Sequence, residues 1–258
     1  MPAAASSAAM KQAPFLALHQ VSRRFANGVQ ALQQVDLQAA RGEFVSLLGP
    51  SGCGKSTVLR LLAGLDAPSS GSVQRPADDV GYVFQEPTLM PWATVADNVR
   101  LPLRLRRAPR AQADAAVRSA LAAVGLDGFA QALPRELSGG MKMRASIARA
   151  LVTRPSLLLL DEPFAALDEI TRFKLNQDLL ALWQRDAFTA VFVTHSVFEA
   201  VFLSQRIVVM GARPGRVVAE VVVDAPYPRL PAFRSSPAFI GWCAEVSQAM
   251  EQASEAAL

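Results

Sequence analysis

One octapeptide constrains this chain more than any other feature. Residues 49–56 read Gly-Pro-Ser-Gly-Cys-Gly-Lys-Ser and match the pattern G-x-x-x-x-G-K-[ST]. Glycines at these places let backbone N–H groups converge on phosphate oxygens without obstruction from side chains. The mostly apolar run 44–48 precedes the octapeptide, and the apolar stretch VLRLLAGL follows it. The order predicted is therefore strand, glycine loop and helix, with a phosphate-binding loop between the two elements.

The side chains of this loop have separate expected tasks. Lys55 can reach the β and γ phosphates of a nucleotide, and the Ser56 hydroxyl can coordinate Mg²⁺. Cys53 occupies a free position of the pattern, so packing is its expected role rather than redox chemistry. The residues expected to bind ATP in this loop are Gly49, Pro50, Ser51, Gly52, Cys53, Gly54, Lys55, Ser56 and Thr57.

Two carboxylates follow a second apolar run. Leu157 to Leu160 is followed directly by Asp161 and Glu162. Parallel α/β sheets bind ligands at the carboxyl ends of their strands. We expect Asp161 to hold Mg²⁺ and Glu162 to polarise the attacking water. An apolar run before two acids is often no more than the end of a strand, so the prediction depends on the phosphate loop in the same chain.

A second candidate anion site lies at 137–141, which reads Leu-Ser-Gly-Gly-Met. Paired glycines at the start of the helix expected over 141–152 expose N–H groups and the positive end of a helix dipole, beside the Ser138 hydroxyl. One phosphate loop already holds one nucleotide. The second site is therefore best used in trans, on a nucleotide bound to another copy of the chain. Two chains would then enclose two ATP molecules.

Length and composition exclude several classes of protein. The chain has 258 residues, of which 51% are hydrophobic and 19% charged, so it is not of the disordered class. No run approaches the roughly 18 to 20 apolar residues that span a bilayer. Two cysteines, Cys53 and Cys243, are too few for a disulfide scaffold. Residues 1–14 lack the features of a signal peptide, and we interpret them as a disordered leader.

The net charge of +4 has a local origin. Residues 91–135 contain seven arginines and three aspartates, so the rest of the chain is balanced. Such a patch could bind nucleic acid, dock on a protein, face anionic lipid headgroups or only be solvated. The stretch lies in a helical insertion, predicted at about 91–152, between strands expected near 80–84 and 157–160.

The remaining periodicity indicates an α/β protein. Antiparallel strands are expected at 15–21 and 29–37, and further strands at 190–193, 207–210 and 217–223. Residues 226–258 are interpreted as a proline-rich linker and a C-terminal amphipathic helix.

Taken in order, these motifs resemble those of the ATP-binding subunit of an ATP-binding cassette (ABC) transporter, over about residues 15–225. By this resemblance GPSGCGKST is Walker A, LLLLDE is Walker B and LSGGM is the signature, with Ser138, Gly139, Gly140 and Met141 acting in trans. The implied fold is a P-loop NTPase of ABC type, with a RecA-like parallel sheet, an N-terminal antiparallel β-subdomain and a helical insertion.

The resemblance also implies roles for single residues. Gln85 matches the Q-loop glutamine, which contacts Mg²⁺ and the attacking water, and Asp168 matches the D-loop. His195 matches the switch histidine at the γ-phosphate. Phe25 stands where the family carries an aromatic residue that stacks on adenine, although it could be a core aromatic. The implied catalytic residues are Glu162, His195 and Gln85, and the implied metal ligands are Ser56, Gln85 and Asp161.

The sequence departs from the family pattern at three positions. Met141 and Met143 stand where glutamine is usual, and Ser196 stands where aspartate is usual. None of these changes removes a phosphate ligand or the expected base. We therefore expect ATP hydrolysis to persist, with its rate and coupling open to change.

Three functions fit a chain of this kind. The first is the ATPase of an importer, working as a homodimer with a separate integral membrane permease and, indirectly, a periplasmic substrate-binding protein. The second is an ABC ATPase acting on nucleic acid or the ribosome, which usually carries two cassettes or long insertions. The third is a nucleotide-binding assembly factor with little turnover. One cassette without such insertions favours the importer and no nucleic acid partner.

Two local strings indicate a subfamily. EPTLMPWATVADNV and RIVVMGARPGRVV are similar to those of the nitrate, sulfonate and taurine importers, a group that also includes carriers of thiamine pyrimidine precursors. The resemblance implies uptake of a small anion, with the chain on the cytoplasmic side of the bacterial inner membrane. Trp92 and Met90 are candidates for an apolar contact with the permease.

Overall fold

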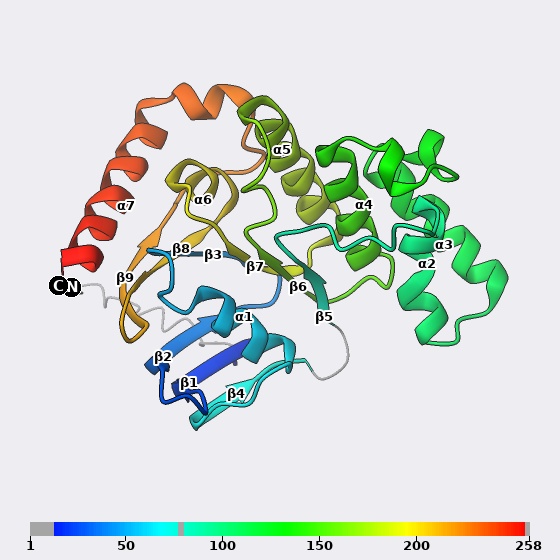
Figure 1. Ribbon diagram of the computed structural model, residues 1–258. Coiled ribbons are helices and arrows are strands. Elements are labelled where there is room, and N and C mark those ends of the chain that lie inside the picture. Colours follow the sequence, from blue (N-terminus) through cyan, green and yellow to red (C-terminus); the bar gives the residue numbers. More distant parts are fainter. Residues whose placement is uncertain (1–12, 77–79, 256–258) are drawn as a thin grey trace, which may run out of the picture.

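The computed structural model describes residues 13–76 and 80–255. Its centre is a six-stranded sheet in the order β5-β6-β7-β3-β8-β9 (Figure 1). Neighbouring strands run parallel except β8 and β9, which are antiparallel. The middle strands are buried on both faces, as continuous apolar runs require. The strands are β3 (Phe44–Leu48), β5 (Val80–Val83), β6 (Leu157–Asp161), β7 (Thr189–Val193), β8 (Arg206–Gly211) and β9 (Arg216–Val222).

A three-stranded antiparallel sheet forms the β-subdomain. Its order is β2 (Gln30–Ala39), β1 (Leu16–Arg24) and β4 (Ser70–Gln74). The apolar faces of this sheet, of α1 (Lys55–Ala63) and of the central sheet meet in one buried cluster. The expected leader lies almost wholly in residues 1–12, outside the described part of the chain.

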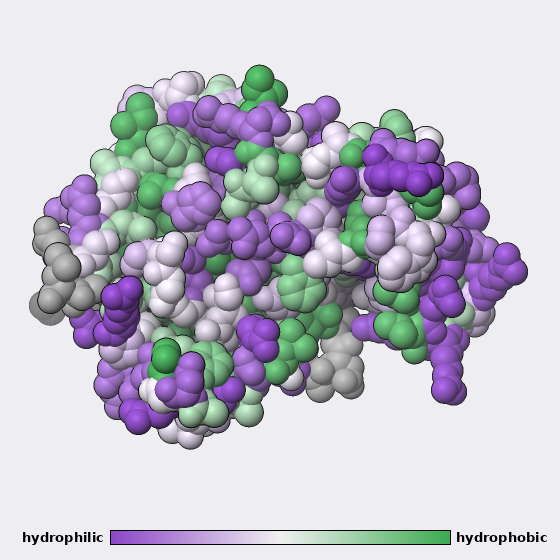
Figure 2. Space-filling view, viewed as in Figure 1, coloured by the Kyte–Doolittle hydropathy of each residue, from purple (hydrophilic) through white to green (hydrophobic). Residues whose placement is uncertain are grey.

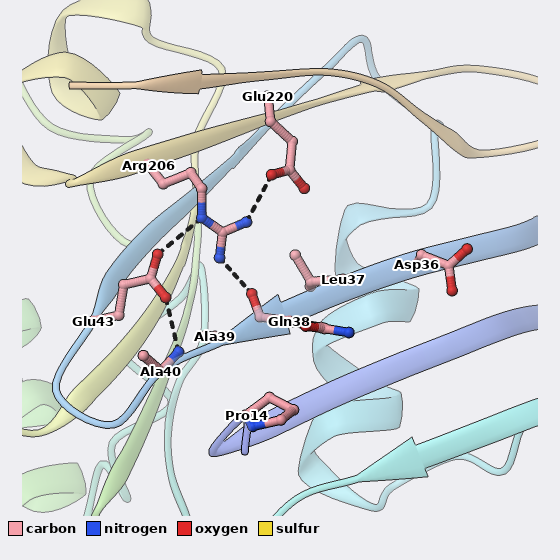
Figure 3. A pocket seen from close by; sticks show the side chains of 9 residues that line it. All are labelled: Pro14, Asp36, Leu37, Gln38, Ala39, Ala40, Glu43, Arg206 and Glu220. Atoms are coloured by element: carbon pink, nitrogen blue, oxygen red, sulfur yellow. Dashed lines mark hydrogen bonds and ion pairs between the residues drawn. The ribbon is translucent and has the colours of Figure 1, made fainter. Parts of the chain in front are cut away.

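Figure 3 shows how the β-subdomain is tied to the central sheet. Arg206 of β8 donates from Nε to Glu43 at 2.9 Å and from Nη1 to Glu220 at 3.0 Å, and it also donates to the carbonyl of Gln38 on β2. These residues line a hollow of about 360 Å³. Because its charges are paired with one another, we interpret this hollow as a structural joint.

The helical insertion projects to one side of the central sheet. It consists of α2 (Val95–Leu105), α3 (Arg110–Ala123) and α4 (Gly139–Leu151) with two short 3-10 helices, Asp127–Phe129 and Pro134–Glu136. Thr94 caps α2 by accepting a hydrogen bond from the N–H of Asp97. Hydrophilic side chains gather at the outer end of the insertion, where α2 and α3 lie (Figure 2).

The C-terminal segment, expected to be a proline-rich linker and an amphipathic helix, packs against the rest of the chain. It contains a 3-10 helix at Pro231–Ser235 and then α7 (Pro237–Glu255), which lies against β8, β9 and α6 (Val197–Leu203). Arg229 is 4% exposed, and its guanidinium donates to five backbone carbonyls. A chain this firmly bonded is part of the core.

In the described residues, no helix has both the length and the apolar character that a membrane span needs.

Candidate nucleotide-binding site

The glycine loop joins β3 to α1, as the sequence predicts. Gly54 adopts a φ of +93°, and a Cβ at this position would lie 2.5 Å from the Leu32 side chain. Only glycine therefore fits where the loop turns into the helix. Lys55 is 6% exposed and donates from Nζ to the carbonyls of Gly49 at 2.8 Å and Pro50 at 3.1 Å. The ammonium group of Lys55 thus binds to backbone carbonyls at the start of its own loop.

Ser56 and Asp161 form the hydroxyl–carboxylate pair expected of a magnesium site. Ser56 Oγ donates to Asp161 Oδ1 at 2.9 Å, and the Tyr82 hydroxyl donates to Asp161 Oδ2 at 3.2 Å. Burial raises the pKa of the Asp161 carboxyl, while both hydrogen bonds oppose that shift. The tertiary fold brings these oxygens together from α1 and β6. Hydroxyl and carboxylate oxygens are the ligands that Mg²⁺ prefers, so the residues fit the ion.

Glu162 lies between the lysine and the histidine singled out by the sequence. Its backbone has a φ of +45°, and its N–H donates to the carbonyl of Val193 at 3.0 Å. One carboxylate oxygen lies 3.9 Å from Lys55 Nζ, and the other lies 3.4 Å from His195 Nδ1. His195 is 58% exposed, so its ring can reach a ligand.

A cleft of about 730 Å³ opens above the loop. Its lining includes Phe25, Gln85, Asp161 and Glu162. The Arg23 guanidinium lies 5.0 Å from the centre of the Phe25 ring. The remaining lining residues are Val29, Gln30, Ala31, Ser51, Gly52, Gly54, Lys55, Ser56, Thr57 and Arg213.

The structure bears on two further residues, Cys53 and Arg213, of which only Cys53 was considered from the sequence. Cys53 is fully buried against the apolar cluster under α1, which agrees with a packing role. Arg213 lines the same cleft as Phe25 and comes from the turn between β8 and β9, far from Phe25 in sequence. The sequence string that contains Arg213 was used to indicate the subfamily, but it gave no sign that Arg213 lines the cleft.

The signature residues lie elsewhere in the chain's structure. Ser138 caps α4 by accepting from the N–H of Met141 at 3.3 Å, and Ser138 and Gly139 are exposed. Asp168 caps α5 (Glu169–Asp186) by accepting from the N–H of Thr171 at 2.9 Å. None of the residues 138–141 lines the cleft of the same chain. The lining of the cleft therefore brings together six of the nine predicted loop residues, the two acids, Gln85 and Phe25. It does not include the signature residues or the predicted Gly49, Pro50, Cys53 and His195.

The profile of the family described as "ABC transporter" matches residues 32–165. The chain belongs to the ABC transporter family. An aliphatic sulfonates import ATP-binding protein of Pseudomonas syringae pv. syringae is 51% identical over 202 residues, which cover 78% of this chain and 83% of the relative. The fold class, a P-loop NTPase of ABC type, is confirmed by solved structures.

Two such structures are similar to the chain. CbiO1 of Clostridium perfringens, described as part of an ABC transporter complex, has a TM-score of 0.75 with 27% identity and covers 82% of this chain and 90% of its own. A dimeric ATP-binding cassette bound to ADP and Pi has a TM-score of 0.72 with 34% identity and covers 82% of this chain and 100% of its own. This protein is thus an ATP-binding, ATP-hydrolysing ABC subunit.

Proposed function

We propose that this ABC ATPase powers a bacterial importer of a small anion of the sulfonate type. The observation that supports this most directly is the relative named for aliphatic sulfonate import, which aligns with 78% of the chain. Nitrate, taurine and thiamine pyrimidine precursors stay as alternative cargoes. In this proposal a separate integral membrane permease carries the cargo, and a periplasmic binding protein delivers it.

In the proposed site, the glycine loop and Lys55 bind the phosphates and Phe25 stacks on the base. Ser56, Asp161 and Gln85 would hold Mg²⁺, which would neutralise phosphate charge when bound. Glu162, which lines the cleft, would accept a hydrogen bond and then a proton from the attacking water as a general base. His195, 3.4 Å from Glu162, adds a donor beside the γ-phosphate.

The proposal includes a homodimer, because the signature residues do not line the cleft of their own chain. The exposed start of α4 presents Ser138 Oγ and free N–H groups, an anion site that the same chain's cleft does not use. A second copy can supply a γ-phosphate to it. The dimeric cassette bound to ADP and Pi, which is similar over 82% of this chain, supports such an arrangement.

A groove between β5, α2 and α4 supports the permease partnership. It measures about 320 Å³, and its lining includes Tyr82, Phe84, Leu105 and Arg149. Phe84 is 41% exposed, Leu105 76% and the nearby Trp92 79%. Exposed apolar side chains of this size indicate a protein-binding surface. Peripheral attachment to the inner membrane would follow from this contact.

The charge of the insertion is only partly free for docking. Arg100 is paired with Asp97 at 2.5 Å and with Asp114 at 2.9 Å. Arg110 also lies 4.0 Å from Asp114, and its side chain is exposed, as are those of Arg104 and Arg107.

Co-purification tests the transport proposal. Tagged protein, isolated from its own cells after gentle membrane solubilisation, should retain a permease, and the complex should hydrolyse ATP faster when a sulfonate-loaded binding protein is added. Recovery of RNA or ribosomes without a permease would instead favour an ABC ATPase acting on nucleic acid. Leu105→Glu should reduce permease recovery, while Leu230→Glu serves as the control, because Leu230 is also an exposed leucine, at 63%, and lies on the C-terminal segment.

A further inference from the structure

A buried carboxylate lies directly behind the catalytic cleft. Glu199 belongs to α6, four residues after His195, and is only 5% exposed. A buried charge is costly unless it is paired and hydrogen-bonded. Glu199 does not line the cleft, so its charge has no direct contact with a nucleotide. Its purpose must lie in the neighbours that it binds.

The first neighbours are the residues on either side of His195. The carboxylate of Glu199 accepts a hydrogen bond from the Thr194 hydroxyl. The N–H of Glu199 donates to Ser196 Oγ at 3.4 Å, and the N–H of Ser196 donates to Thr194 Oγ1 at 3.0 Å. Residues 194–196, which we name the switch loop, are thus bonded to Glu199 on both sides of the histidine. These bonds limit the directions in which the His195 ring can point.

The second neighbour is Arg172 on α5. Its Nε lies 3.9 Å from a carboxylate oxygen of Glu199. The same guanidinium donates to the carbonyls of Phe164 at 3.2 Å, Ala165 at 3.3 Å and Leu167 at 2.8 Å. These carbonyls belong to the segment 164–167 that leads directly to Asp168. Arg172 therefore connects the buried carboxylate to the backbone of the D-loop.

Asn176 completes the set of donors around the carboxylate. Its Nδ2 donates to Glu199 Oε1 at 3.4 Å. Three donor side chains from two segments, α5 and the switch loop, thus surround one carboxylate, and an ionised carboxylate can accept about four hydrogen bonds. An amide in its place would turn an NH₂ group toward one of these donors. The arrangement of donors therefore fits a carboxylate better than an amide.

We propose that Glu199 is a positioning residue for ATP hydrolysis. Its carboxylate holds the switch loop and the D-loop in one fixed relation, so that His195 keeps its place beside Glu162. The inference rests on the proposed catalytic role of His195. It adds to that role a residue that touches neither ATP nor the reacting water.

Steady-state ATPase kinetics of the full chain test the proposal. Glu199→Gln should lower kcat about ten-fold or more, because the rate of the chemical step falls steeply when an active-site group is displaced. The KM for ATP should change less than about two-fold. Thr194→Val should lower kcat in the same way, and Thr194→Ser, which keeps the hydroxyl, should restore it. Glu43→Gln is the matched control: it breaks the ion pair with Arg206 of Figure 3 and should leave kcat unchanged.

A double-mutant cycle separates positioning from a general loss of structure. If Glu199 acts through His195, Glu199→Gln combined with His195→Ala should be no slower than His195→Ala alone. If the kcat losses of the two single variants multiply in the double variant, the inference is wrong. It is also wrong if Glu199→Gln keeps its kcat while His195→Ala is slow. A His195→Ala variant with full kcat would overturn the catalytic role of His195 and the inference together. The Thr194 pair decides the matter if Glu199→Gln does not fold.

Discussion

At the scale of single residues, the partners of the Lys55 ammonium group are the first point. In the structure its ammonium donates to two carbonyls of its own loop and lies 3.9 Å from Glu162. Phosphate oxygens offer stronger acceptors than neutral carbonyls, because hydrogen bonds between two charged groups are shorter and stronger. In the proposed site, a bound nucleotide would therefore replace the two neutral carbonyl partners of Lys55 with phosphate oxygens.

Lys55→Ala should weaken nucleotide binding. Charge-assisted hydrogen bonds contribute about 1.5 to 3 kcal/mol, which corresponds to a rise in Kd of about ten-fold to a hundred-fold. Titration with a fluorescent ATP analogue measures this change. Lys174→Ala removes an exposed lysine from α5 and should leave Kd as it is. Unchanged binding in Lys55→Ala would show that the loop is not the nucleotide site.

Glu162→Gln should separate binding from turnover. Glutamine keeps the shape of the side chain but cannot take a proton, so kcat should fall at least about a hundred-fold, as expected for loss of a general base. Its Kd for ATP should remain within about three-fold of the original, or become tighter. Phosphate release measured beside ATP binding gives both quantities. Glu245→Gln, an exposed glutamate of α7, provides the comparison, and a Glu162→Gln variant with near-normal kcat would contradict the assignment.

At the scale of elements, the C-terminal segment shows how one side chain can hold several together. Arg229 donates to carbonyls of Val201, Phe202 and Ser204, where α6 ends, and to Val223 and Ala225 after β9. Carbonyls at the end of a helix lack partners within the helix. The guanidinium of Arg229 donates hydrogen bonds to these carbonyls, and it thereby connects α6, β9 and the segment before α7.

Arg229→Ala should therefore destabilise the protein. Its loss leaves buried carbonyls without donors, at a cost of about 3 kcal/mol. For a chain of this size, Tm should fall by about 6 to 12 °C, which thermal denaturation followed by circular dichroism measures. Arg118→Ala, on the exposed face of α3, should shift Tm by less than about 2 °C. Equal Tm values for the two variants would mean that the carbonyls find other donors.

At the scale of the whole molecule, the two candidate phosphate-binding sites lie on different parts of the chain. The glycine loop belongs to the central sheet, whereas the exposed start of α4 belongs to the helical insertion (Figure 1). A Cβ on Gly140 would lie 2.7 Å from the Thr171 side chain, so the start of α4 packs closely on α5. This close packing keeps Ser138 and Asp168 on neighbouring helix starts, where a second copy could meet both.

Glu162→Gln with ATP should accumulate a closed dimer. Size-exclusion chromatography with light scattering should give twice the mass of one chain in the presence of ATP and a single chain in its absence. Ser138→Arg in the same background places a large cation at the start of α4 and should prevent dimerisation without changing the affinity of the cleft for ATP. A mass of one chain in Glu162→Gln under saturating ATP would contradict the proposed dimer.

The sequence by itself determined the local chemistry of this protein. A glycine loop, a strand that ends in two acids and the paired glycines at 139–140 each need only neighbouring residues, so their patterns predicted the nucleotide site and the fold class. Elements with weak local signals were missed. The edge strand β4 is mostly exposed and has one apolar residue, and α2 contains Pro102 among arginines.

The tertiary structure alone decided which distant residues share the site. Ser56 and Asp161 are separated by 105 positions, and Arg213 reaches the cleft from the turn between β8 and β9. In the sequence, nothing distinguishes Glu199 from other helix residues. Its proposed role depends on hydrogen-bond donors from other segments. Such roles follow from packing and from the cost of unpaired buried charge, and neither leaves a periodic pattern along the chain.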